Sequence, residues 1–146
     1  MSELNLPSYP FKIRTTGQSK EIFDSLRRKF VLLTPEEWVR QHFVEFLKNE
    51  LGYPASLIAI EKGFKVNQRS KRADIVIHNR SGMPWMIVEC KASHVVLTEE
   101  AFYQAASYHL KLNVSYLIIT NGLQHYCCKF ENGTFAFVEG FPTFNS

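Results

Sequence analysis

Two acidic residues and a lysine are spaced so that they would meet at one end of a β-sheet. A nearly continuous apolar run ends abruptly in Glu89-Cys90-Lys91. Because side chains alternate between the two faces of a strand, Glu89 and Lys91 are expected on one face and Cys90 on the other. Asp74 lies on the preceding expected strand, in what resembles a hairpin. An antiparallel pair would therefore bring both carboxylates and the ammonium group together.

Such a group of side chains suits the hydrolysis of phosphodiester bonds. The reaction must bring a water nucleophile to an anionic phosphorus and stabilise the leaving oxyanion, and a divalent cation held by carboxylates does both. Mg²⁺ prefers oxygen ligands and keeps several waters, so two carboxylates and one main-chain carbonyl suffice to hold it. A neighbouring lysine would orient the water or stabilise the transition state as a point charge. These residue types predict a metal-dependent phosphodiesterase.

Short apolar runs bounded by turn residues predict the strands that would carry these groups. The run that ends at Cys90 is apolar at successive positions, which is typical of a strand buried on both faces. The expected strands of the sheet cover Leu57–Ile60, Ala73–His78, Trp85–Cys90 and Tyr116–Thr120. Two more, Gln124–Phe130 and Thr134–Val138, flank Glu131-Asn132-Gly133, which is a strong hairpin signal.

Two long helices are expected to cover this sheet. The clearest helix start is Thr34-Pro35-Glu36-Glu37, where a capping threonine precedes a proline at the first helical position. Apolar residues then recur at helical spacing through Leu51. The second helix opens at Thr98 and runs to about Leu112. The order of elements predicts an α/β fold, with a central mixed sheet flanked by helices and a C-terminal β-hairpin.

Only short elements are expected before the first long helix. Residues 1–8 look like a loose end. Phe11–Arg14 alternates apolar and basic residues as a short edge strand does, and Ser19 begins a short helical stretch with Ile22, Phe23 and Leu26 on its apolar face. The chain has 146 residues without a linker or an internal repeat, so one domain over residues 1–146 is expected.

The composition of the chain limits which kinds of protein and which kinds of binding site are expected. A formal net charge of +3 permits nucleic-acid binding without demanding it. The three cysteines are an odd number without zinc-site spacing, which favours a reducing, cytoplasmic setting. No apolar run approaches the length that spans a bilayer, so no membrane role is expected. The chain has no P-loop, so it cannot itself supply ATP-driven translocation.

The same residues resemble a known family. Asp74 followed by Glu89-Cys90-Lys91 matches the signature of PD-(D/E)xK nucleases, with an alanine where the nominal proline would precede the aspartate. More specifically, Ile22–Gln41, with its Arg27-Arg28-Lys29-Phe30 and the helix start described above, is similar to the N-terminal nuclease domain of type I restriction enzyme R subunits. The resemblance covers nearly the whole chain and implies a restriction-endonuclease-like core.

This resemblance implies a set of metal ligands and a catalytic lysine. Asp74, Glu89 and the main-chain carbonyl of Cys90 would ligate Mg²⁺, for which Mn²⁺ is the expected substitute. Lys91 would serve catalysis.

The resemblance also implies helix residues that complete the site. An acid on the first helix commonly does so, and both Glu36 and Glu37 match it. Glu36 shares the apolar face of the helix whereas Glu37 fits a capping box, so the choice stays open. On the second helix, Gln104 and Tyr108 match a QxxxY element of related nucleases and lie on one helix face. Gln104 would reach the site, and Tyr108 would contact the DNA backbone or brace the lysine.

The function expected from these features is that of a Mg²⁺-dependent DNA endonuclease domain. Lys71 and Arg72 lie next to the first acid and are candidates for gripping phosphates. The expected partners are DNA and, where translocation matters, an ATP-dependent translocase or other restriction-modification subunits; a homodimer would allow both strands to be cut. The alternative is a nuclease-like fold that binds nucleic acid or a partner protein without cutting.

Overall fold

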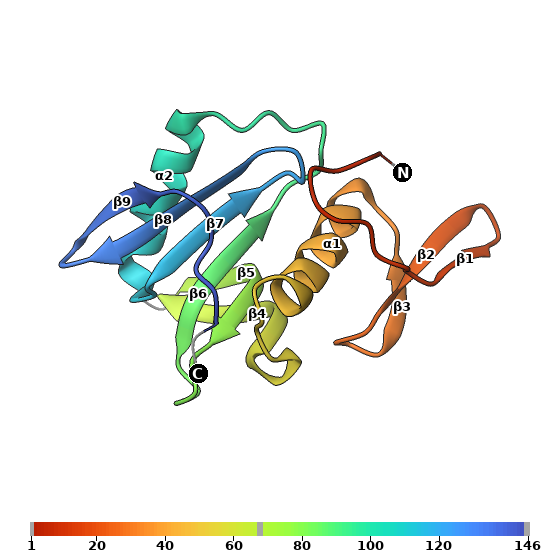
Figure 1. Ribbon diagram of the computed structural model, residues 1–146, viewed down its shortest axis with the longest axis horizontal. Helices are drawn as coiled ribbons and strands as arrows, with labels where there is room; N and C mark the ends of the chain where they lie inside the picture. Colours follow the sequence, from red (N-terminus) through yellow and green to blue (C-terminus); the bar gives the residue numbers. More distant parts are fainter. Residues whose placement is uncertain (1, 67–68, 145–146) are drawn as a thin grey trace.

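The chain forms two separate β-sheets and two α-helices (Figure 1). The computed structural model describes residues 2–66 and 69–144, and within them it leaves the side chains of residues 61–72 and 111 undescribed. The strands are β1 (Ile13–Thr16), β2 (Ser19–Asp24), β3 (Lys29–Leu32), β4 (Ile58–Val66), β5 (Arg69–His78), β6 (Pro84–Cys90), β7 (Tyr116–Thr120), β8 (His125–Glu131) and β9 (Thr134–Val138). The helices are α1 (Pro35–Asn49) and α2 (Glu99–His109), with short 3-10 turns at Ala55–Leu57 and Leu110–Leu112.

The larger sheet is mixed, as the sequence predicts. Its six strands lie in the order β4-β5-β6-β7-β8-β9, and all neighbours are antiparallel except β6 and β7. The parallel pair is joined by a crossover that contains α2, because parallel neighbours cannot be linked by a tight turn. The predicted C-terminal hairpin is confirmed as β8–β9, with Asn132 and Gly133 both at positive φ (52° and 76°).

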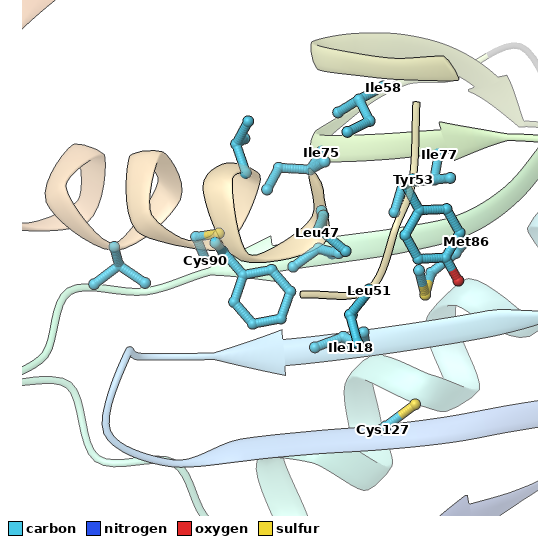
Figure 2. Packing of buried hydrophobic residues seen from close by; sticks show 14 residues of the cluster. Leu47, Leu51, Tyr53, Ile58, Ile75, Ile77, Met86, Cys90, Ile118 and Cys127 are labelled. Carbon is cyan, nitrogen blue, oxygen red and sulfur yellow. The ribbon is translucent and has the colours of Figure 1, made fainter. Parts of the chain in front are cut away.

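The two helices cover opposite faces of this sheet (Figure 1). Met86 and Val88 of β6 pack in the cluster under α1, whereas Ile87 packs in the cluster under α2. All three side chains are 0% exposed, so the prediction of a strand buried on both faces is confirmed. Figure 2 shows the α1 side, where Leu47 lies close to Ile75 of β5. Each such aliphatic side chain contributes about 1.5–3 kcal/mol through burial.

Both helices begin where the sequence predicts. The Thr34 hydroxyl accepts a hydrogen bond from the Glu37 amide at 3.0 Å, and the Thr98 hydroxyl accepts one from the Ala101 amide at 3.0 Å. These bonds satisfy main-chain donors that have no partner within the helix. Neither α1 nor α2, nor any other helix in the described part of the chain, is long and apolar enough to cross a membrane.

The predicted helical stretch from Ser19 is wrong, because this segment forms the central strand of the smaller sheet. The predicted edge strand before it exists but lies at Ile13–Thr16, two residues further along. Ile22 is fully buried while Phe23 pairs with Phe30 on the opposite face. In so short a segment the spacing of apolar residues fits a helix or a strand equally well. Pairing with β1 and β3 makes this segment a strand.

The predicted loose end, residues 1–8, is irregular but packed in its described part. Leu4 and Leu6 contact the core under α1. The Asn5 amide donates a hydrogen bond to the Gly122 carbonyl at 2.8 Å. Gly122 has a φ of 86°, which favours glycine, and a Cβ atom there would lie 2.7 Å from Leu4 Cδ2, so the leucine side chain would have to shift.

A buried aspartate ties the smaller sheet to α1. Asp24, at the end of β2, is 0% exposed. Its carboxylate accepts hydrogen bonds from the amides of Leu26 and Arg27 at 2.9 Å, from Arg27 Nε at 2.6 Å and from Gln41 Nε2 of α1 at 2.9 Å. The two main-chain amides and Arg27 Nε would lose this partner if the carboxylate were removed, whereas Gln41 Nε2 also donates to Glu37 at 3.0 Å.

We expect Asp24→Asn to lower the free energy of unfolding by about 2–4 kcal/mol at neutral pH, because the half-buried Arg27 and several donors lose a buried anion. Burial alone would raise the pKa of Asp24, but hydrogen bonds from Arg27 and Gln41 and the Arg27 charge lower it overall. The carboxylate therefore stabilises the fold above its unfolded pKa of about 3.9, and this is lost as the pH falls through the lower folded pKa. Urea unfolding should show the gap between wild type and variant narrowing in acid.

Glu21→Gln is the matched control on the same strand, because Glu21 pairs with Arg14 at the surface. It should change stability little. An Asp24→Asn variant as stable as this control would contradict the role given to Asp24.

Candidate active site

The two acids singled out in the sequence lie on adjacent antiparallel strands. Ile75 of β5 pairs with Val88 of β6. Because the strands are antiparallel, continuing this register by one residue places Asp74 opposite Glu89. The Cys90 amide donates a hydrogen bond to Asp74 Oδ2 at 2.8 Å. Both carboxylates therefore lie at the same end of the strand pair, but Asp74 contacts Arg40 of α1 whereas Glu89 contacts His109 of α2, and these helices cover opposite faces of the sheet.

Asp74 lies in a crowded electrostatic setting. Burial raises the pKa of its carboxyl group, the Cys90 amide and the Arg40 guanidinium lower it, and the charges of Glu36 and Glu89 raise it again. The net result is a pKa above the usual value for an aspartate. Burial of the carboxyl group is the largest cause of this raised pKa, and the two nearby acids add to it.

Arg40 of α1 supplies positive charge next to these acids. Its side chain is only 8% exposed, and its guanidinium lies 3.5 Å from Asp74 Oδ1, 3.6 Å from Glu36 Oε1 and 3.3 Å from Glu37 Oε1. Sequence reasoning missed Arg40 as a site residue. The available signal was its position one helical turn after the two acids of the first turn of α1.

The structure separates the two candidate acids of α1. Glu36 is 46% exposed and close enough to Asp74 for its charge to raise the pKa of that carboxyl group. Glu37 is turned toward the smaller sheet, where it accepts hydrogen bonds from Arg27 at 3.3 and 3.4 Å and from Gln41 at 3.0 Å. Of the two, the geometry brings Glu36 toward Asp74, and a catalytic role for it stays a prediction.

Glu89 is held by a buried histidine. His109 Nε2 contacts Glu89 Oε1, and His109 is 4% exposed on the inward face of α2. Burial alone would raise the pKa of Glu89, but the hydrogen bond and charge of His109 and the charge of Lys91 lower it overall. Sequence reasoning also missed His109, although it lies seven residues after the buried Phe102, on the same face of the helix.

Glu89, Lys91 and Gln104 line one pocket of about 320 Å³ between the sheet and α2. Phe102 and Ile119 are among the apolar residues of its wall. The alternation through Glu89 and Lys91, together with the exposed Gln104 of α2, thus brings three predicted site residues to one pocket.

Among the described side chains, those of Asp74, Cys90 and Tyr108 do not line this pocket. Tyr108 is 52% exposed, and its ring meets the ring of His109 at 5.3 Å. The side chains of Lys71 and Arg72 lie outside the described residues. The Cys90 thiol is fully buried on the α1 face, and burial raises its pKa well above the usual value, so it is no nucleophile.

The side chains that could hold a metal ion are few. Among those that the structure describes, no three from His, Cys, Asp and Glu are arranged as a set of ligands. The predicted Mg²⁺ ligands include only two of these side chains, Asp74 and Glu89. The third predicted ligand is the main-chain carbonyl of Cys90. The contact seen at Cys90 is made by its amide.

Comparisons with known proteins identify a matching family and a similar solved structure. Residues 35–142 match the family described as type I restriction enzyme R protein N terminus. No curated protein matches the chain. A solved structure, described as a fragment of an HsdR subunit of a type I restriction enzyme from Vibrio vulnificus YJ016, is 22% identical to this chain with a TM-score of 0.57.

That likeness shows a common α/β, restriction-endonuclease-like fold. It covers 76% of this chain but only 24% of the HsdR fragment, so the chain spans about a quarter of that protein's length. The family match, by contrast, extends over most of the chain and includes both helices and the whole six-stranded sheet. The protein therefore belongs to the family of N-terminal domains of type I restriction enzyme R proteins.

Proposed function

We propose that this chain is a metal-dependent DNA endonuclease domain of the restriction type. The observation that supports it most is that Asp74 and Glu89 lie at the same end of adjacent strands, with Lys91 beside Glu89 in one pocket. The Glu89 and Lys91 charges lie close enough for Lys91 to lower the pKa of Glu89. Family membership supports a nuclease domain at the coarser level.

The donor set fits Mg²⁺ by its chemistry. Asp74 and Glu89 offer hard oxygen ligands, and the Cys90 carbonyl would add a third. Burial and the charges of Glu36 and Glu89 raise the pKa of Asp74, which is the setting that a bound cation would stabilise. Mn²⁺ prefers the same oxygen-rich surroundings and is the proposed substitute.

Each neighbouring residue has a role in this proposal. When bound, Mg²⁺ would supply positive charge at the phosphate and lower the pKa of a coordinated water. Lys91 carries an ammonium group that would orient the water or balance charge on the phosphate. His109 fixes the Glu89 carboxylate through their contact. Gln104 lines the same pocket and would contact the phosphate or the water.

DNA is the proposed substrate, and other subunits are the proposed partners. The solved HsdR fragment is about four times as long as the part that this chain covers, which leaves room for functions that this chain does not contain. An ATP-dependent translocase or restriction-modification subunits would supply movement along DNA, and a homodimer would cut both strands. Lys71, Arg72 and Tyr108 remain proposed contacts to the DNA backbone.

We expect the purified protein to cleave plasmid or single-stranded DNA in Mg²⁺ or Mn²⁺. Glu89→Gln and Lys91→Met should each lower the rate about 100-fold or more, because each removes a charge that acts in the transition state. Gel analysis of the products measures this. Lys129→Gln is the matched control, since Lys129 pairs with Glu131 on the terminal hairpin, and it should cleave as wild type does.

The non-catalytic alternative predicts a different pattern in the same assay. A binding module would retain DNA equally in the wild type and both site variants, and none of the three would cut. That result would rule out the endonuclease proposal.

We expect Mn²⁺ titration calorimetry to detect one site per chain in the wild type. Asp74→Asn should raise the Kd about tenfold or more, because the ligand loses its charge. His109→Gln should weaken binding about 10- to 100-fold by releasing Glu89. Equal Mn²⁺ affinity of wild type and Asp74→Asn would contradict the proposed ligand set, whether or not the protein cleaves DNA.

A further inference from the structure

Lys91 lies just beyond the end of the strand that carries the candidate site. The parallel pairing of β6 with β7 ends at Cys90 and Thr120. One residue later, the Lys91 amide donates a hydrogen bond to the Thr120 carbonyl at 2.8 Å. The Lys91 side chain itself is exposed. Its position therefore depends on the loop that follows, residues 92–97, as well as on the strand.

The 92–97 loop has little apolar contact to hold it. Val95 is 38% exposed and Val96 is 79% exposed, whereas Leu97 is buried at the end of the loop. The Val95 amide donates a hydrogen bond to the Ala92 carbonyl at 3.0 Å, which closes a turn within the loop. A segment with few buried apolar contacts opens easily unless hydrogen bonds to the rest of the protein hold it.

Asn121 supplies such a bond from the turn between β7 and β8. This residue is buried, and its Nδ2 donates a hydrogen bond to the Val95 carbonyl at 2.8 Å. The same side chain also holds its own turn, because its Oδ1 accepts hydrogen bonds from the amides of Leu123 at 2.9 Å and Gln124 at 2.7 Å. One buried amide group thus joins the 92–97 loop to the turn after β7.

Two consecutive residues of β7 and its turn therefore hold the main chain around Lys91. Thr120 accepts from the Lys91 amide, and Asn121 donates to the Val95 carbonyl. Thr120 is 0% exposed, and its hydroxyl accepts a hydrogen bond from the Gly122 amide at 2.9 Å. The main chain is thus fixed on both sides of the turn in the loop. A flexible lysine stem that starts from a fixed main chain has fewer places to put its ammonium group.

We propose that Asn121 is a positioning residue, which holds Lys91 in the candidate site by fixing the loop that follows it. The proposal rests on the proposed nuclease function and adds to it a residue outside the pocket. Asn121 does not line the pocket that contains Glu89 and Lys91, so it acts through the loop. An amide side chain suits this position because the turn requires an acceptor and the loop requires a donor, and a carboxylate offers only acceptors.

The test compares Asn121→Ser with a matched control, Asn79→Ser. Asn79 holds the turn between β5 and β6 in the same way, because its Oδ1 accepts hydrogen bonds from the amides of Ser81 at 2.9 Å and Met83 at 3.0 Å. In both variants the shorter hydroxyl can still accept from the turn amides. At position 121 it is too short to reach the Val95 carbonyl as well.

Two NMR measurements separate a positioning role from a merely structural one. Hydrogen exchange of the Lys91 and Val95 amides reports on the loop, and it should be about three- to tenfold faster in Asn121→Ser only. The side-chain Cε signal of Lys91, assigned by its loss in Lys91→Met, reports on the surroundings of the ammonium group. It should move toward the position of a fully solvated lysine in Asn121→Ser only. If thermal unfolding shows that this variant is not folded, Asn121→Asp, which keeps the acceptor without the donor, takes its place.

In the cleavage assay, Asn121→Ser should lower kcat about 10- to 100-fold, because the ammonium group is misplaced. KM and the Kd for Mn²⁺ should stay within about twofold of the wild type, since the acids are not moved. Faster exchange with an unchanged Lys91 signal, an unchanged kcat, or no difference from Asn79→Ser would each overturn the proposal. A wild type that does not cleave DNA would refute the proposed nuclease function, and the two NMR measurements would still decide whether Asn121 positions Lys91.

Discussion

The Asp74 carboxylate at the ends of β5 and β6 is the point on which the candidate site depends. In the described part of the chain, β5 pairs with β6 from Ile75–Val88 onward, and beyond that pair the Cys90 amide turns to the Asp74 side chain. The parallel neighbour β7 supports β6 as far as Cys90 and Thr120. A carboxylate thus replaces a main-chain partner at the sheet end. This holds an acid at a strand terminus, where a ligand can reach it.

Charges of alternating sign link this point to the smaller sheet. The series runs from Asp24 through Arg27, Glu37 and Arg40 to Asp74, with each neighbouring pair in contact. Buried ion pairs of this kind add little net stability, because desolvation offsets their attraction. Breaking one link is costly, however, since it leaves a charge buried without its partner. The series therefore fixes the relative position of two sheets that share no strand.

The features of the structure that could be predicted from the sequence are those that a local pattern of residues determines. Alternation along β6 places Glu89 and Lys91 in one pocket, and the capping pattern at Thr34 predicts where α1 begins. Prediction from the sequence fails where contacts between residues distant in the chain determine the structure. The strand from Ser19 depends on its register with two neighbours. Arg40 and His109 reach their acids from helices, across 34 and 20 positions of the chain, and helical spacing alone does not show which strand residue they meet.

The acidic candidate site would repel the proposed DNA substrate, because both carry negative charge. Positively charged groups must therefore contribute to the affinity for DNA. Burial is the main cause of the raised pKa of Asp74, and the charges of Glu36 and Glu89 raise it further. Phosphate brought close adds more negative charge, and Arg40 is already engaged by three acids. Coulomb repulsion at such distances is not fully screened by physiological salt. In the proposed nuclease, the metal ion and Lys91 of the pocket would offset part of this repulsion, and cations outside the pocket would add to the affinity.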